Sequence, residues 1–338
     1  MKKLLATTAL VGLVTSSAAI AEVKIGGSIE QTYNSVSIGG TGTGGKSDLG
    51  QEVNLKISSS KELDNGLKVT GSANLEDKGS DQAFDSTSIK FSGDALSFHV
   101  GVDTGQHMHS NINPRVDDNP FDSVSLSGTD GMIRKQAHDK QHVGLDFASD
   151  FGKVAVNYSP NGSSNKAGGS STGNGDDGSI TEINFKGSLG VDGLTVLLGQ
   201  ETIEAKDSGA TADGSSEEEE TVIGVSYNMG QFAVGASQRS FDDGNNSTVN
   251  NDIDTVTAIS ATFALNDNVS VGVEQLTGEF ELGGSSGKTD EETTAITLGY
   301  NLGGLAVSAM YVEADNVGGS TSTANDKESF QLRTVYKF

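Results

Sequence analysis

The sequence contains no cysteine and no tryptophan, and only three of its 338 residues are proline. Without cysteine the chain cannot form a disulfide framework, which excludes the disulfide-rich class of exported domains. After residue 21 no segment approaches the roughly 20 consecutive apolar residues that a membrane-spanning helix needs. Apolar residues make up only 34% of the chain, whereas glycine is abundant, with 45 residues. This composition leaves two classes: a largely soluble β protein, or a transmembrane barrel whose strands are apolar on one face only.

Basic residues are also few, because 22 Lys+Arg stand against 46 Asp+Glu and give a formal net charge of −24. A nucleic-acid partner is therefore excluded, since phosphates need cations opposite them. The acidic excess favours solubility and the binding of divalent cations. Three oxygen-rich acidic segments, 175–178, 217–220 and 290–292, are candidate Ca²⁺ sites. A solvated charge run is the commoner interpretation, and no segment has the spacing of a full calcium loop. No other cofactor is expected.

The first 21 residues have the parts of a secretory signal peptide. A basic head, Met1-Lys2-Lys3, precedes an apolar run at 4–14, and Ala19-Ile20-Ala21 forms a small-x-small cleavage site. The apolar run is too short for a membrane helix. We therefore expect export and cleavage before Glu22. Residues 22–338 then form a single domain, and the loss of Lys2 and Lys3 leaves 20 basic against 46 acidic residues, a net charge of −26.

The mature region alternates between apolar and polar residues with a period of two, the pattern of strands with one apolar face. In the last segment Phe330, Leu332 and Tyr336 share one side, while Gln331 and Arg333 share the other. Sixteen such segments are predicted, at roughly 22–36, 49–60, 67–76, 84–93, 95–103, 140–149, 152–159, 179–189, 194–204, 219–229, 231–240, 253–265, 268–278, 291–301, 304–313 and 328–338.

The connections between these segments alternate in length: short turns such as 93–94 and 266–267 alternate with long polar segments such as 37–48 and 160–178. An even strand number with tight turns at one end and long loops at the other is typical of outer-membrane barrels. A charge on the lipid face costs about 2–4 kcal/mol at the midplane, so the ionic faces must line water. We predict an all-β fold, a 16-stranded antiparallel transmembrane β-barrel that closes by pairing its last strand with its first. This closure predicts that Glu22 and Phe338 lie close together, with both termini on the periplasmic side.

Residues 104–139 form the longest segment with neither strand nor helix periodicity, and they are the third long connection. The segment holds Pro114 and Pro120, two of the three prolines. A connection of this length inside a compact domain is commonly functional. We predict that this loop folds into the lumen and sets the size limit of the pore.

The two ends of the mature chain carry a family resemblance. The start, Glu22-Val23-Lys24-Ile25-Gly26-Gly27, and the end, Val335-Tyr336-Lys337-Phe338, bracket the sixteen strands and resemble a general (diffusion) porin of Gram-negative bacteria, closest to the alphaproteobacterial type. The resemblance implies an outer-membrane homotrimer in contact with lipid and lipopolysaccharide. It also implies passive diffusion of small hydrophilic solutes and ions rather than enzymatic activity. The terminal Phe338 resembles the signal read by the barrel assembly machinery.

Selectivity in such a pore comes from its radius and from charged side chains at its constriction. The resemblance implies acidic loop residues that face basic residues on the wall. The candidate constriction residues on the loop are Asp117, Asp118, Asp122, Asp130 and Arg115, and those on the wall are Lys56 and Arg333, followed by Lys24, Lys68 and Lys90. Lysines near the short turns are equally consistent with a solvated rim. From the acidic excess we expect mild cation selectivity.

The five histidines all lie in or beside the same loop: His99, His107, His109, His138 and His142. Three interpretations stay open. The histidines could bind Zn²⁺ or Cu²⁺, they could titrate near pH 6.5 and alter conductance, or they could simply be polar lumen residues.

The sequence distinguishes some rival functions from that of a general porin, but not all of them. A substrate-specific outer-membrane channel or a surface adhesin on the same barrel stays open, because solute choice would lie in loop 104–139. An enzyme is disfavoured, because no nucleophile–base pair has a fixed spacing. A secreted calcium-binding repeat protein would need Gly-Gly-x-Gly-x-Asp repeats with a nine-residue period, which the sequence lacks.

Overall fold

A computed structural model of the protein describes residues 22–39, 46–77, 82–117, 137, 140–160, 177–205, 217–242, 253–280, 289–319, 322 and 326–338. Within these ranges the chain forms one short 3₁₀ turn, η2 (Val317–Gly319), and sixteen strands. The strands are β1 (Glu22–Ile38), β2 (Lys46–Glu62), β3 (Lys68–Asp77), β4 (Gln82–Ser92), β5 (Leu96–Gly101), β6 (His142–Ser149), β7 (Gly152–Ser159), β8 (Asp177–Gly187), β9 (Leu194–Ala205), β10 (Glu218–Asn228), β11 (Phe232–Asp242), β12 (Ile253–Ala264), β13 (Val269–Phe280), β14 (Glu291–Asn301), β15 (Leu305–Asp315) and β16 (Lys327–Lys337). Among the described residues no helix is both long and apolar enough to cross a membrane.

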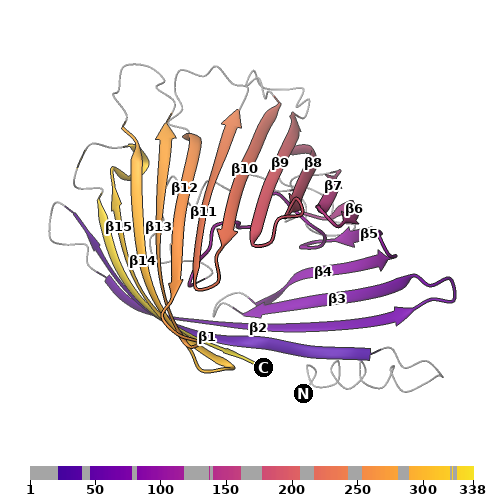
Figure 1. Cartoon of the computed structure of the whole chain (residues 1–338), viewed down its shortest axis with the longest axis horizontal. Coiled ribbons are helices and arrows are strands. Elements are labelled where there is room, and N and C mark those ends of the chain that lie inside the picture. The colour runs from indigo at the N-terminus through magenta and orange to yellow at the C-terminus, as the bar shows by residue number, and fades with distance from the viewer. Residues whose placement is uncertain are drawn as a thin grey trace.

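The strands form one closed antiparallel sheet, in which sequence neighbours pair and β16 returns to pair with β1 (Figure 1). Gly27 and Phe338 exchange two backbone hydrogen bonds, each 3.0 Å long. Closure leaves no open sheet edge, so the backbone polar groups of the strands are paired internally. The predicted 16-stranded barrel is confirmed. The expected proximity of Glu22 to Phe338 is wrong in register, because Glu22 lies opposite Ser60 of β2 and Phe338 meets Gly27 instead.

The two faces of the sheet separate by chemical character as the alternation predicts. On β6, Leu145 and Phe147 are exposed on the outside, whereas His142 and Asp146 are buried on the inside. Outward apolar residues like these recur on almost every strand. A continuous band of exposed apolar side chains around a barrel is buried only by the hydrocarbon of a membrane.

Several tight turns are built by local hydrogen bonds that an asparagine side chain accepts. Between β10 and β11, Asn228 Oδ1 accepts a hydrogen bond from Gly230 N at 2.9 Å. Between β14 and β15, Asn301 Oδ1 accepts one from Gly303 N at the same distance. Gly230 and Gly303 have φ of 83° and 81°, a left-handed conformation that glycine adopts without a steric cost. These turns set the strand register at this end of the barrel.

Some of the buried apolar residues lie between the wall and the chain that follows β5. One cluster joins Met108 and Ile112 of that chain to Leu197 of β9 and Val222 of β10. A barrel wall alone has no such core, because the neighbours of a strand lie beside it in the sheet and do not cover its inward face. The segment after β5 therefore supplies the packing partner of the inner wall.

Candidate functional site

The chain turns into the barrel directly after β5, and residues 104–117 are called the inner loop below. Its contacts advance around the wall: Gln106 Nε2 donates to Asn184 Oδ1 on β8 at 2.6 Å, Asn113 Nδ2 to Ser237 Oγ on β11 at 3.2 Å, and Arg115 Nε to Glu274 Oε2 on β13 at 2.5 Å. Asp117 then reaches β15 and β16. The inner loop therefore lies along the inside of the wall from β6 to β16. The prediction that the third long loop folds into the lumen is confirmed for residues 104–117, and residues 118–136 and 138–139 lie outside the described residues.

Inward-facing glycines make room for this path. They lie on β9, β10, β11, β13 and β14, and we call them the glycine track: Gly199, Gly224, Gly235, Gly272 and Gly299. A Cβ atom on any of them would overlap an inner-loop side chain: Met108, Ile112, Pro114 and, for the last two, Val116. In the sequence these glycines are visible only as part of the high glycine content. The available signal was their position on the inward-facing side of adjacent strands.

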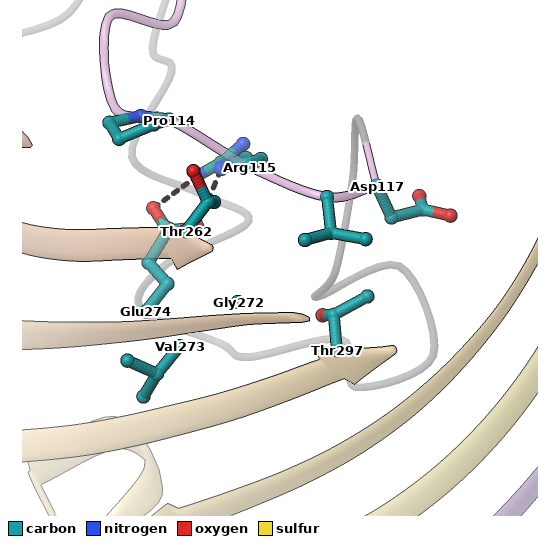
Figure 2. A pocket seen from close by; sticks show the side chains of 9 residues that line it. Pro114, Arg115, Asp117, Thr262, Gly272, Val273, Glu274 and Thr297 are labelled. Atoms are coloured by element: carbon teal, nitrogen blue, oxygen red, sulfur yellow. Dashed lines mark hydrogen bonds and ion pairs between the residues drawn. The ribbon is translucent and has the colours of Figure 1, made fainter. Parts of the chain in front are cut away.

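The loop is closely seated where it crosses β13. Arg115 donates from Nε and Nη2 to the two carboxylate oxygens of Glu274, at 2.5 and 2.7 Å (Figure 2). Figure 2 also shows Asp117 pointing away from this pair, toward the far strands. The space left between loop and wall here is about 10 Å³, hardly enough for one water molecule. The structure thus places Arg115 as a bidentate anchor of the loop on the wall.

The end of the inner loop meets the predicted basic residue of the wall. Arg333 Nη1 donates to Asp117 Oδ1 at 2.5 Å, and Arg333 Nη2 donates to Glu30 Oε2 at 2.5 Å. Ser308 Oγ also donates to Asp117. Among the candidate constriction residues, Asp117 and Arg333 are thus in direct contact. Asp118, Asp122 and Asp130 lie outside the described residues.

The wall of β1–β4 borders an open part of the lumen. A cavity of about 630 Å³ is lined there by Lys24, Lys56, Asn54 and Asp103, among others. Two of the predicted basic residues therefore face open space. The acidic residue in the lining of this cavity is Asp103, which directly precedes loop 104–139. Asp103 was not among the candidate constriction residues.

Lys90 lies at the base of the inner loop. Its Nζ donates to Asp146 Oδ2 at 2.9 Å, and Lys153 Nζ approaches the same oxygen at 3.4 Å. Asp146 Oδ1 accepts a hydrogen bond from Gln106 N at 3.3 Å. Lys90 thus reaches across β5 to Asp146 on β6 and helps to fix the start of the loop.

The described histidines lie in separate places. His99 and His142 make an edge-to-face ring contact at 5.4 Å beside β5 and β6, and His142 Nε2 lies 3.1 Å from Thr104 O. His109 instead lies against β9, β10 and β11, within reach of Glu201, Glu220 and Arg239. His107 is on the same loop, where its carbonyl oxygen accepts a hydrogen bond from Ser110. His138 lies outside the described residues. The described histidines therefore do not form one metal-binding cluster, and the potential metal ligands near His109 are carboxyl groups rather than other histidines.

Two of the candidate calcium segments are strand ends rather than loops. Glu218–Glu220 belong to β10 and Glu291–Glu292 to β14. Glu220 and Glu291 are buried on the inward face. The predicted strands 219–229 and 291–301 already include most of these acidic residues. In segment 175–178, β8 begins at Asp177, and residues 175–176 lie outside the described residues.

Comparison with known proteins agrees with this architecture. The model of the Gram-negative porin family matches residues 6–319. A variant of the porin from Rhodopseudomonas blastica with two introduced tryptophans has a similar structure, with a TM-score of 0.63 at 12% identity. A triple mutant of the same porin has a TM-score of 0.62 at 12% identity. A structure described with the words "Asymmetric conductivity of engineered proteins" also has a TM-score of 0.62 at 12% identity.

Each of these three alignments covers 94% of this chain and 100% of the other. At this identity they show a shared fold. A search of curated proteins found no match. The family model covers most of the chain, and its match agrees with the closed barrel. The chain belongs to the family of Gram-negative porins.

Proposed function

We propose that this porin forms a water-filled channel through which small hydrophilic solutes and ions diffuse passively across the outer membrane. The supporting observation is the division of the lumen: the inner loop lies on the wall from β6 to β16, and a cavity of about 630 Å³ stays open beside β1–β4. A barrel of this strand number is wide enough for an aqueous channel. The family is one of channels, and the proposal includes no catalytic step.

Liposome swelling tests this function. Vesicles containing the purified protein are diluted into sugars of increasing size, and the swelling rate is measured. A smooth decline with sugar size is expected of a diffusion pore, because the inner loop acts as a size limit. A single preferred sugar would instead indicate a substrate-specific channel. Failure of every sugar to enter would contradict the channel itself and favour an adhesin.

We further propose mild cation selectivity. The support is the excess of acidic residues, 46 against 22 basic ones in the whole chain. Lys24 and Lys56 on the open wall oppose this excess and keep the selectivity small. The reversal potential in a salt gradient across a planar bilayer measures it, and a value that favours chloride would contradict the proposal.

Assembly in the membrane is proposed on the same basis. Porins are generally oligomeric in the outer membrane, and we propose a homotrimer in contact with lipid and lipopolysaccharide. We propose export by residues 1–21, cleavage before Glu22, periplasmic termini, and recognition of the last strand, ending in Phe338, by the barrel assembly machinery. Calcium binding at segment 175–178 stays a prediction. Gel mobility before and after heating, with mass spectrometry of the mature chain, tests the trimer and the cleavage site.

A further inference from the structure

Three glutamates stand side by side on the inward face of β8, β9 and β10. The strand register places Glu182 opposite Glu201, and Glu201 opposite Glu220. Their exposed fractions are 0%, 1% and 4%. Residues directly opposite each other in an antiparallel sheet have Cβ atoms about 4.5–5.5 Å apart, and like charges in that arrangement are destabilising. Burial increases the cost, so such a row requires positive charge close by.

Among the described residues, two side chains that could supply this charge contact the row. Arg239 Nη1 donates to Glu220 Oε1 at 3.2 Å and lies 2.9 Å from His109 Nδ1. A guanidinium group can only donate, so a hydrogen bond between these two atoms requires the tautomer of His109 with a lone pair on Nδ1. Within this group of five side chains, Arg239 is the one permanently charged cation beside three glutamates.

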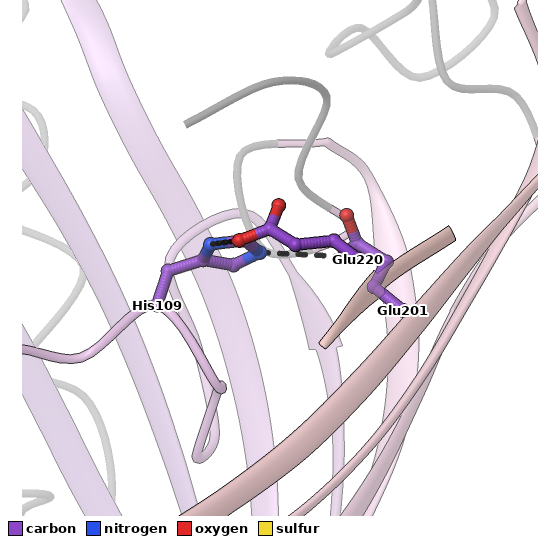
Figure 3. Close-up of side chains that lie close together, drawn as sticks. All are labelled: His109, Glu201 and Glu220. Carbon is purple, nitrogen blue, oxygen red and sulfur yellow. Dashed lines mark ion pairs between the residues drawn. The ribbon is translucent and has the colours of Figure 1, made fainter. Parts of the chain in front are cut away.

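The imidazole of His109 faces the carboxyl groups of Glu201 and Glu220, and each of its ring nitrogens lies near one of them (Figure 3). Its Nε2 is 3.6 Å from Glu201 Oε2, and its Nδ1 is 3.6 Å from Glu220 Oε1. One donor atom from each of the three side chains lies within 4.8 Å of the others. Ligand atoms around a tetrahedral Zn²⁺ ion, bound at about 2.0–2.2 Å, are roughly 3.3–3.5 Å apart. Small side-chain shifts would bring the three donors to this spacing.

A further buried oxygen adds to the negative charge beside this cluster. Glu182 Oε1 accepts hydrogen bonds from Met108 N at 3.1 Å and Asn157 Nδ2 at 3.0 Å. Glu182 Oε2, on the same fully buried side chain, has no hydrogen-bond partner among the described residues. A buried carboxylate oxygen next to Glu201 without a donor is an expensive arrangement unless a cation lies close to it.

We propose that His109, Glu201 and Glu220 bind a divalent transition-metal ion of the zinc class. A neutral imidazole with carboxylates is a donor set that suits such ions. Binding through Nε2 moves the ring proton to Nδ1, so the side chain of Arg239 must give up its contact with that nitrogen.

The ion would join both limbs of loop 104–139 to the wall. His109 belongs to the inner loop, and Glu201 Oε2 also accepts a hydrogen bond at 3.0 Å from the backbone N of Ala137, near the other end of that loop. Glu201 and Glu220 belong to the neighbouring strands β9 and β10. The site would therefore fix the loop to the barrel, whatever solutes the channel conducts.

The test is metal binding by the folded barrel in detergent after removal of metals with a chelator. Titration calorimetry with Zn²⁺ is expected to show one ion per chain. Co²⁺ is expected to give the visible absorption of a low-coordinate site with a histidine ligand. His109→Gln and Glu201→Gln should each weaken Zn²⁺ binding at least about tenfold. The matched control is His107→Gln, two residues away on the same loop, which should bind Zn²⁺ like the unchanged protein.

Several outcomes would overturn the proposal. They are the absence of stoichiometric Zn²⁺ binding by the unchanged protein, a cobalt spectrum of the hydrated ion, and equal affinities for His107→Gln and His109→Gln. The first two need no variant, so the proposal stays testable even if a substitution prevents folding. Heat-dependent gel mobility and far-ultraviolet circular dichroism establish that each variant compared is folded.

Discussion

The lumen has two differently built sides. On β1–β4, Lys24, Lys56 and Asn54 project into an open cavity. On β9–β14, the inward positions instead hold the glycine track and buried acids, and the inner loop covers them. Both sides follow the same alternation of inward and outward residues. The difference is that side-chain size, rather than polarity, decides where a second layer of backbone can lie against the wall.

The charges on the two sides also differ in their surroundings. On the covered side, Arg115 with Glu274 and Arg333 with Asp117 are close, largely buried pairs. Removing one partner of such a pair leaves a charge with little water around it, which costs several kcal/mol. A solvated lysine on the open side does not depend on a charged partner for its stability, because water surrounds it. Substitutions on the two sides should therefore separate stability from selectivity.

The largest effect is expected from Arg115→Leu on the covered side. Glu274 would stay buried without its bidentate partner, at a cost of up to about 3–5 kcal/mol in the free energy of unfolding. The loop can escape this cost only by leaving the wall, so single-channel conductance should change as well. Denaturant unfolding in detergent micelles and planar-bilayer recordings measure the two effects.

The double variant Arg115→Leu/Glu274→Leu is the control for this prediction. Two apolar side chains of similar volume replace the ion pair without leaving a charge, so most of the lost stability should return. If the double variant is as unstable as the single one, the pair is not what holds the loop.

A smaller effect is expected where the loop ends. Asp117→Asn removes the charge that Arg333 and Ser308 hold, and hydrogen bonds to charged groups contribute about 1.5–3 kcal/mol each. The end of the inner loop should then separate from β15 and β16, which changes the conductance. Glu30→Gln alters the same arginine without touching the loop and serves as the matched control. Equal changes in conductance for both variants would show that Arg333 acts on the pore independently of the loop.

The glycine track offers a test of the covered side that involves no charge. Gly224→Val would place a side chain where Ile112 packs, and such overpacking costs about 1–3 kcal/mol. Because the wall is hydrogen-bonded on both sides, the loop should move toward the lumen and lower the conductance. Gly71→Val on β3 is the control, since a Cβ atom there meets nothing within 4 Å. An unchanged conductance for Gly224→Val would mean that the loop position does not depend on the track.

The strands could be predicted from the sequence because each carries its own signal. Alternation on β16 assigned Arg333 to the inside without any knowledge of its partners. The pairing of a loop aspartate with Arg333 also followed, from strand parity together with the family resemblance. The positions of the tight turns also agreed with the prediction, because their asparagines and glycines form hydrogen bonds with residues no more than three positions away.

The path of the inner loop could not be predicted in the same way. Its partners are distant in the sequence: Arg115 meets Glu274, and Met108 meets Gly199. Such contacts depend on the register of many strands at once, so no local pattern contains them. The same limit explains Lys90, whose partner Asp146 is separated from it by the whole of loop 104–139.

The smallest change in stability and the clearest change in selectivity are expected on the open side. Lys56→Glu should alter the free energy of unfolding by no more than about 0.5 kcal/mol, because the side chain is exposed to the open cavity. It replaces a positive charge on the conduction path by a negative one, so the reversal potential should shift in the direction of greater cation selectivity. High salt should reduce the shift, since the charge is solvated and screened. Lys61→Glu, at the end of β2 and outside the cavity lining, should shift the reversal potential less, and an equal shift would place the selective part of the pore away from the β1–β4 wall.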